Sequence, residues 1–112
     1  MDEILRRLES LHPKIIDLKL DRVKRLLRKL GNPERSLPPI IHVAGTNGKG
    51  STIAMIKAGL QSSGLKTHVY TSPHLVHFNE RIEIAGKRIS ENTLKKVLTE
   101  CENINNSEPI TL

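Results

Sequence analysis

Apolar residues in the first third of the chain recur at helical spacing. In residues 2–11 and 17–30 they stand three and four positions apart, which predicts two helices with one apolar face each. Asp17 can cap the second helix, and Gly31 and Pro33 are expected to end it. The other face of this second helix is basic and carries Lys19, Arg22, Lys24, Arg25, Arg28 and Lys29.

The pattern changes at residue 40. Residues 40–44 are a short apolar run rich in β-branched side chains, which is typical of a buried strand. A glycine-rich loop follows, then a predicted helix from about Lys49 to Ser63 and a second strand from Lys66 to Thr71. This order predicts a βαβ unit of a parallel sheet, and therefore an α/β fold.

A hairpin and a third long helix are predicted in the remainder. Residues 81–84 and the run to Ile89 alternate polar and apolar side chains, and Ala85-Gly86 can turn between them. Ser90 is expected to cap a helix that ends near residues 105–107. Residues 109–112 resemble the start of a further strand.

The composition of the 112 residues favours one small domain with little stability to spare. Tyr70 and Phe78 are the only aromatic residues, so aliphatic side chains must form the core. Cys101 is the only cysteine, which excludes an intrachain disulfide. No apolar run has the length of a signal peptide or a membrane span, so we expect a cytoplasmic protein without membrane association.

The net charge of +6 is concentrated near the amino terminus, where residues 1–38 hold ten Lys and Arg against six Asp and Glu. Such an excess favours anionic partners without distinguishing nucleic acid from ATP or a polycarboxylate. A nucleic-acid-binding module built on the basic helix is the weaker alternative. Single-strand binders stack bases on aromatic side chains, and a charged run is usually a solvated helix face.

The strongest chemical signal is the glycine-rich loop. Glycines allow successive main-chain N–H groups to converge on phosphate oxygens, and the helix that follows adds the positive end of its dipole. Lys49 would neutralise the β- and γ-phosphates and is the predicted catalytic residue, while a hydroxyl of Ser51 or Thr52 can reach phosphate or Mg²⁺. The predicted phosphate-binding residues are Gly45, Thr46, Asn47, Gly48, Lys49, Gly50, Ser51 and Thr52.

This loop departs from the common pattern G-x-x-x-x-G-K-[ST]. Val43 stands at the place of the first glycine, and Gly50 at the place of the hydroxyl residue. Its context is nevertheless the required one, because it follows a predicted strand and opens a predicted helix. A glycine-rich turn with an incidental lysine is therefore the weaker interpretation.

Residues 42–52 resemble the nucleotide loop of the folylpolyglutamate synthase and dihydrofolate synthase family, a branch of the Mur ligase group. A second block, Thr71-Ser72-Pro73-His74-Leu75 followed by residues 78–82, is similar to the loop after the second strand of folate-type members. Two blocks in this order make the resemblance specific. The second block also argues against a cell-wall amino-acid ligase, the nearest rival.

The resemblance implies ATP-dependent ligation of L-glutamate to a carboxylate of folate or dihydropteroate through an acyl phosphate, with Mg²⁺. It implies that Ser72 is a Mg²⁺ ligand, with Ser51 as the alternative. It further implies that Ser72, Pro73 and His74 belong to a folate-binding loop. Without the resemblance, Ser72 would be read as an ordinary turn residue.

The remaining candidate side chains have weaker claims to chemistry. Glu80 and Arg81 are expected to pair with neighbours and shape the second loop, and His77 either touches the substrate or is an ordinary loop residue. Structural or surface roles are expected for His12, His68 and Cys101, and His42 is expected to pack or hydrogen-bond at the strand end rather than to act as an acid or base.

Family members are several-fold longer than this chain. The resemblance therefore implies that residues 1–112 are an incomplete P-loop-type ATPase domain with a parallel sheet, preceded by two helices, and that the carboxy-terminal glutamate-binding domain is absent. A partner chain carrying the missing half is one possibility. A truncated, catalytically inactive remnant is the main alternative, because an unfinished sheet leaves an uncovered apolar face.

Overall fold

The computed structural model describes residues 1–11 and 20–110, and the chain divides into two compact units. The first unit comprises Met1–Pro39 and Glu91–Leu112, and the second comprises Ile40–Ser90.

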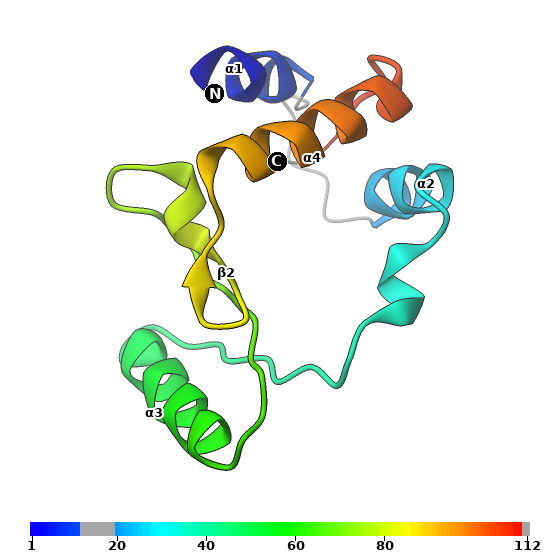
Figure 1. Cartoon of the computed structure of the whole chain (residues 1–112). Helices are drawn as coiled ribbons and strands as arrows, with labels where there is room; N and C mark the ends of the chain where they lie inside the picture. Colours follow the sequence, from blue (N-terminus) through cyan, green and yellow to red (C-terminus); the bar gives the residue numbers. More distant parts are fainter. Residues whose placement is uncertain (12–19, 111–112) are drawn as a thin grey trace. The chain divides into compact units, whose positions relative to one another are not determined.

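Three helices form the first unit: α1 (Asp2–Ser10), α2 (Asp21–Lys29) and α4 (Glu91–Asn105). Both α1 and α2 pack against α4 (Figure 1). The short 3₁₀ helix η1 (Pro33–Ser36) follows α2, which ends just before Gly31 as predicted. The proposed capping role of Asp17 lies outside the described residues.

The core of the first unit is aliphatic, as the composition requires. Ile4 and Leu8 of α1 cluster with Ile110, and Leu94 of α4 is only 2% exposed. The N–H of Ile110 donates to the carbonyl of Leu11 at 3.2 Å, so the end of the described chain is tied to the end of α1. Neither Pro109 nor Ile110 forms the predicted strand.

Ion pairs join the helices of this unit. Arg7 of α1 binds Glu102 of α4 through two hydrogen bonds, Nε to Oε2 at 2.7 Å and Nη2 to Oε1 at 3.0 Å. Glu108 pairs with Arg25 at 2.5 Å and with Lys29 at 3.3 Å. Part of the basic face of α2 is thus neutralised within the chain.

The second unit combines one helix with a small sheet. Helix α3 (Lys49–Ser62) agrees with the predicted helix. Strands β1 (Val69–Tyr70), β2 (Ile82–Ile84) and β3 (Lys87–Arg88) pair in that order, antiparallel throughout, and η2 (Phe78–Arg81) immediately precedes β2.

The predicted hairpin is confirmed. Ile84 pairs with Lys87, and the two residues between them, Ala85 and Gly86, have φ of 51° and 82°. Positive φ at both central positions is typical of the hairpin turn whose twist matches that of the flanking strands.

The strand predicted for residues 40–44 is not formed in this structure, where the segment has no regular secondary structure. Among the described residues no parallel strand pair occurs. A strand needs a neighbour to satisfy its main-chain N–H and C=O groups, and no described strand pairs with this segment. The α/β character holds, because the described residues combine helices with a small antiparallel sheet.

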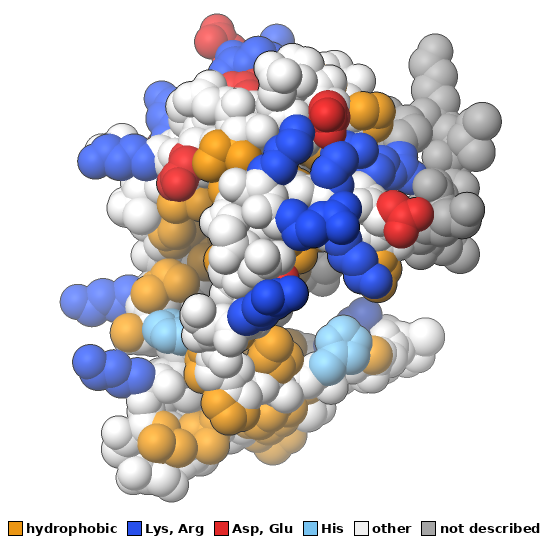
Figure 2. Space-filling view, turned by 90° about the vertical axis from the view of Figure 1, so that its right-hand side faces the viewer, with side chains coloured by type: hydrophobic (Ala, Val, Ile, Leu, Met, Phe, Trp, Pro, Cys, Tyr) orange, Lys and Arg blue, Asp and Glu red, His pale blue; other side chains and the backbone are white. Residues whose placement is uncertain are grey.

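Every side chain found buried in residues 1–11 and 20–110 belongs to the first unit. Large apolar side chains of the second unit are exposed, including Ile40, Ile41, Met55, Leu65, Tyr70 and Ile84. Figure 2 shows apolar side chains on the surface alongside groups of Lys and Arg. Among the helices of the described residues, none is both long and apolar enough to cross a membrane.

Candidate functional site

The glycine-rich loop enters helix α3 through backbone conformations that favour glycine. Gly45 and Gly48 have φ of 150° and 75°, and Gly48 directly precedes Lys49, the first residue of the helix. The first helical hydrogen bond runs from the N–H of Thr52 to the carbonyl of Gly48, at 3.0 Å. The N–H groups of residues 49–51 therefore have no partner within the helix and remain as donors for an anion.

The loop that carries these donors is open to solvent. All eight predicted loop residues are exposed. A Cβ atom added at Gly45, Gly48 or Gly50 would meet no other atom within 4 Å. The loop thus has the donors and the room that a phosphate group requires, at the positive end of a 14-residue helix.

Side chains at the start of α3 add charge and hydroxyl groups to this end of the helix. Within the described residues, Lys49 makes no ion pair, so its ammonium group is available to an outside anion. The Thr52 hydroxyl donates to the Gly48 carbonyl at 2.9 Å, which leaves its oxygen lone pairs for a ligand. Ser51 is exposed beside it.

The second predicted site segment follows β1. The N–H of Thr71 donates to the carbonyl of Arg81 at 2.8 Å, which closes the base of the loop. Ser72 and Pro73 are exposed and joined by a cis peptide bond, whereas His74 is half-buried.

Three side chains of this second loop form a cluster. Nε of Arg81 donates to Nδ1 of His74 at 2.8 Å, and the guanidinium lies 4.7 Å from the centre of the Phe78 ring. The His74 and Phe78 rings are 5.5 Å apart and tilted by 58°. Because Nδ1 accepts this bond, the imidazole proton of His74 resides on Nε2.

Glu80 binds the main chain of the same loop. Its Oε1 accepts from the N–H of Leu75 at 2.8 Å, and its Oε2 accepts from those of Val76 at 3.1 Å and His77 at 2.7 Å. These bonds lower the pKa of Glu80 to about 2, and the bond from His77 contributes most, followed by the bond from Leu75. The expectation that Glu80 and Arg81 shape the loop is confirmed, although nothing in the sequence indicated this triple contact.

Both loops belong to the second unit, but no hydrogen bond or ion pair between described residues joins them directly. The described residues also contain no group of three or more His, Cys, Asp or Glu side chains arranged for a metal ion. The candidate metal ligands Ser51 and Ser72 are hydroxyls, which are hard oxygen ligands suited to Mg²⁺ together with water and phosphate oxygens.

The side chains expected to be structural fit that role where they are described. Nδ1 of His68 accepts from the N–H of Ala85 at 2.9 Å and so supports the hairpin. Cys101 is half-buried in α4, where burial and, to a lesser extent, the charge of Glu100 raise the pKa of its thiol. His42 is exposed and lies in a segment without regular structure, so the packing expected for it at a strand end is not seen, and His12 lies outside the described residues.

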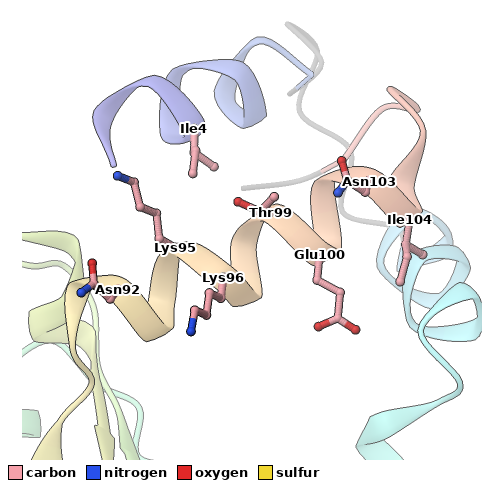
Figure 3. Close-up of a pocket in the computed structure, with 8 residues that line it drawn as sticks. All are labelled: Ile4, Asn92, Lys95, Lys96, Thr99, Glu100, Asn103 and Ile104. Carbon is pink, nitrogen blue, oxygen red and sulfur yellow. The ribbon is translucent and has the colours of Figure 1, made fainter.

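A shallow hollow of about 690 Å³ lies in the first unit and includes neither loop. Figure 3 shows Ile4 of α1 pointing toward α4, which supplies the rest of the lining. The lining residues are Ile4, Asn92, Lys95, Lys96, Thr99, Glu100, Asn103 and Ile104. None of them was predicted as a site residue.

Comparison with curated sequences finds relatives that are described as dihydrofolate synthase/folylpolyglutamate synthase. No protein-family model matches the chain. The dihydrofolate synthase/folylpolyglutamate synthase of Bacillus subtilis (strain 168) is 49% identical over 72 residues, 64% of this chain and 16% of that protein. The protein of the same description from Escherichia coli (strain K12) is 41% identical over 95 residues, 85% of this chain and 22% of that protein.

Comparison with solved structures finds proteins of the same description as the sequence relatives. The bifunctional folylpolyglutamate synthase/dihydrofolate synthase of Yersinia pestis, complexed with AMPPNP and a Mn ion, superposes with a TM-score of 0.85 at 37% identity, over 98% of this chain and 27% of that one. Escherichia coli FolC in complex with DHPP and ADP also gives a TM-score of 0.85 at 37% identity, over 98% of this chain and 26% of that one. The chain thus spans about a quarter of these solved proteins.

Proposed function

Because this chain belongs to the family of folylpolyglutamate and dihydrofolate synthases, we propose that it supplies the ATP-binding loop of a ligase that joins L-glutamate to folate or dihydropteroate. The observation that carries this proposal is the exposed loop Gly45–Thr52 at the start of α3, with its unpaired N–H groups and the open space before them. Relatives solved with AMPPNP or ADP support the assignment of a nucleotide to this loop.

The chemistry explains why such a loop is needed. A carboxylate is a poor electrophile, so the γ-phosphoryl group of ATP is first transferred to it, and the amine of glutamate then displaces phosphate from the acyl phosphate. Catalysis of phosphoryl transfer depends mainly on positioning and on neutralising negative charge. In this chain the N–H groups of residues 49–51 would orient the phosphates, and Lys49 would neutralise them.

A divalent cation fits the donors at the two loops. Ser72 is the proposed Mg²⁺ ligand and Ser51 the alternative, each contributing one hydroxyl alongside water and phosphate oxygens. Mg²⁺ would supply additional positive charge to the phosphates when bound. Both serines are exposed and therefore accessible to the ion.

The second loop is the proposed binding site for the carboxylate substrate. Ser72 and Pro73 are exposed, and His74 is held by Arg81 with its proton on Nε2, where it can donate to a polar edge of a pterin ring. The solved complex of FolC with DHPP supports a substrate of this class.

We further propose that residues 40–44 form a strand of a parallel sheet when neighbouring polypeptide covers them. Ile40 and Ile41 are 73% and 61% exposed, an unfavourable arrangement for β-branched side chains in water. In this view residues 1–112 are the ATP-binding part of a larger ligase, and the glutamate-binding part lies outside these residues.

The nucleotide assignment is tested by titrating the chain with MgATP in a calorimeter. Replacing Lys49 by alanine removes a charge-assisted bond worth about 1.5–3 kcal/mol, so ATP should bind about 10- to 150-fold more weakly. Lys87→Ala, a change to an exposed lysine of β3 in the same unit, is the matched control and should leave the affinity unchanged. Equal affinities of the wild type and the Lys49 variant would contradict the proposal.

Ligase activity is tested separately, with radiolabelled glutamate, ATP and either folate or dihydropteroate. Label in a pterin-containing product assigns the activity, and the preferred acceptor distinguishes folylpolyglutamate from dihydrofolate synthesis. A chain that binds ATP but incorporates no glutamate would be a nucleotide-binding module without ligase activity of its own.

A further inference from the structure

The Glu80 carboxylate holds three successive main-chain N–H groups, those of Leu75, Val76 and His77, at 2.7–3.1 Å. A carboxylate that accepts three such hydrogen bonds constrains the main chain at all three residues. The loop here contains no regular secondary structure of its own between β1 and η2. Glu80 is therefore the main internal constraint on the conformation of residues 75–77.

The constrained segment displays apolar side chains to the outside. Leu75 is 93% exposed and Val76 is 73% exposed, although each is large enough to be stabilised by burial. His74, the residue just before them, is fixed independently through Arg81. The loop thus presents an apolar pair next to an oriented imidazole.

We infer that Glu80 is a positioning residue for the pterin-bearing substrate: by holding the N–H groups of residues 75–77, it sets Leu75 and Val76 against the flat ring system while His74 meets a polar ring edge. The inference rests on the proposed function. A flat heteroaromatic ring with polar edges suits such a surface, because its faces are covered by aliphatic side chains and its edges by a hydrogen-bonding group.

Glutamine is not equivalent to glutamate at this position. The two carboxylate oxygens together accept three bonds, and an amide group would place an NH₂ donor against at least one of the three N–H groups. Glu80→Gln should therefore release part of the segment, and Glu80→Ala all of it.

The rest of the second unit is held without this carboxylate. The N–H of Thr71 donates to the carbonyl of Arg81, and the N–H of Ile89 donates to the carbonyl of Ile82 at 2.9 Å. The amide group of Asn79 donates to the carbonyl of Ile89 at 3.2 Å. We therefore expect both Glu80 variants to retain the hairpin and helix α3.

The experiment titrates the wild-type chain and its variants with folic acid, dihydropteroate and, separately, MgATP. For Glu80→Gln the dissociation constant of the pterin ligand should rise about tenfold, and for Glu80→Ala it should rise further, while that of MgATP stays within about twofold. Glu83→Gln is the matched control, because it removes a carboxylate of β2 that pairs with Lys57 at 2.5 Å and does not contact the loop.

A readout of position accompanies the titrations. In ¹H–¹⁵N spectra, Glu80→Gln should shift the amide signals of Leu75, Val76 and His77 and leave those of α3 in place. Pterin affinity that is unchanged despite these shifts would overturn the inference. So would a parallel loss of pterin and ATP binding with altered α3 signals, since Glu80 would then serve only to maintain the fold.

Failure of the inference is distinguishable from failure of the proposed function. A wild-type chain that binds MgATP in a Lys49-dependent manner but neither pterin ligand would overturn the inference and leave the nucleotide assignment standing. A wild-type chain that binds none of the three ligands would overturn both.

Discussion

Alanine at Gly48 should lower the stability of the chain, whereas alanine at Gly50 should raise it slightly or leave it unchanged. The two glycines lie two residues apart at the start of α3 and are both exposed. Gly48 has φ of 75°, whereas no left-handed φ occurs at Gly50, the second residue of the helix. The two substitutions therefore add the same methyl group to different backbone conformations.

The sizes of the two stability changes depend on backbone conformation alone, because a Cβ atom at either position meets no other atom within 4 Å. A side chain in the left-handed region costs about 1–2 kcal/mol, which sets the expected loss for Gly48→Ala. Alanine is favoured over glycine within helices by about 1 kcal/mol, which sets an upper limit on the gain for Gly50→Ala near the helix end.

Urea denaturation followed by circular dichroism at 222 nm measures both effects. The midpoint should fall for Gly48→Ala and rise or stay level for Gly50→Ala, with an unchanged slope in each case. If Gly50→Ala lowered the midpoint as much as Gly48→Ala, the description of the loop and the start of α3 would be refuted.

Three further predictions concern the core, the second loop and the surface. Leu94→Ala should destabilise the first unit by about 2–5 kcal/mol, because Leu94 is 2% exposed, and thermal unfolding would measure the loss. The pKa of Glu80 is lowered from 4.5 to about 2, so its stabilising contribution is complete above pH 4.5 and is lost as the pH falls toward 2. Acid unfolding of the wild type should therefore be steeper in that pH window than acid unfolding of Glu80→Gln. Identical unfolding profiles of the two proteins would contradict the assignment. Glu83→Gln should cost no more than about 1 kcal/mol at low salt, less in 1 M NaCl, because its pair with Lys57 is partly exposed.

Local signals made much of the secondary structure predictable. The periodic apolar positions of α1 and α2 and the Ala85-Gly86 turn predicted elements that the structure confirms among the described residues. The strand expected at residues 40–44 is not formed, because a strand needs a neighbouring strand that the local sequence does not supply. The parallel sheet remains a proposal for the same reason.

The sequence predicts where the phosphate loop lies, from glycines before a helix with a lysine at its start, and this assignment stays a proposal. The positive φ of Gly48 agrees with that interpretation. The three bonds of Glu80 and the contact between His74 and Arg81 were not predictable in detail. They depend on how the chain folds back on itself, which residue types alone do not determine.

The most direct test of the central claim is a ¹H–¹⁵N spectrum of the chain recorded with increasing MgATP. The account predicts saturable shifts concentrated on the amides of residues 45–52, with tripolyphosphate competing for the same signals. Shifts confined to the basic helix α2 or to the hollow along α4, with the amides of residues 45–52 unmoved, would contradict it.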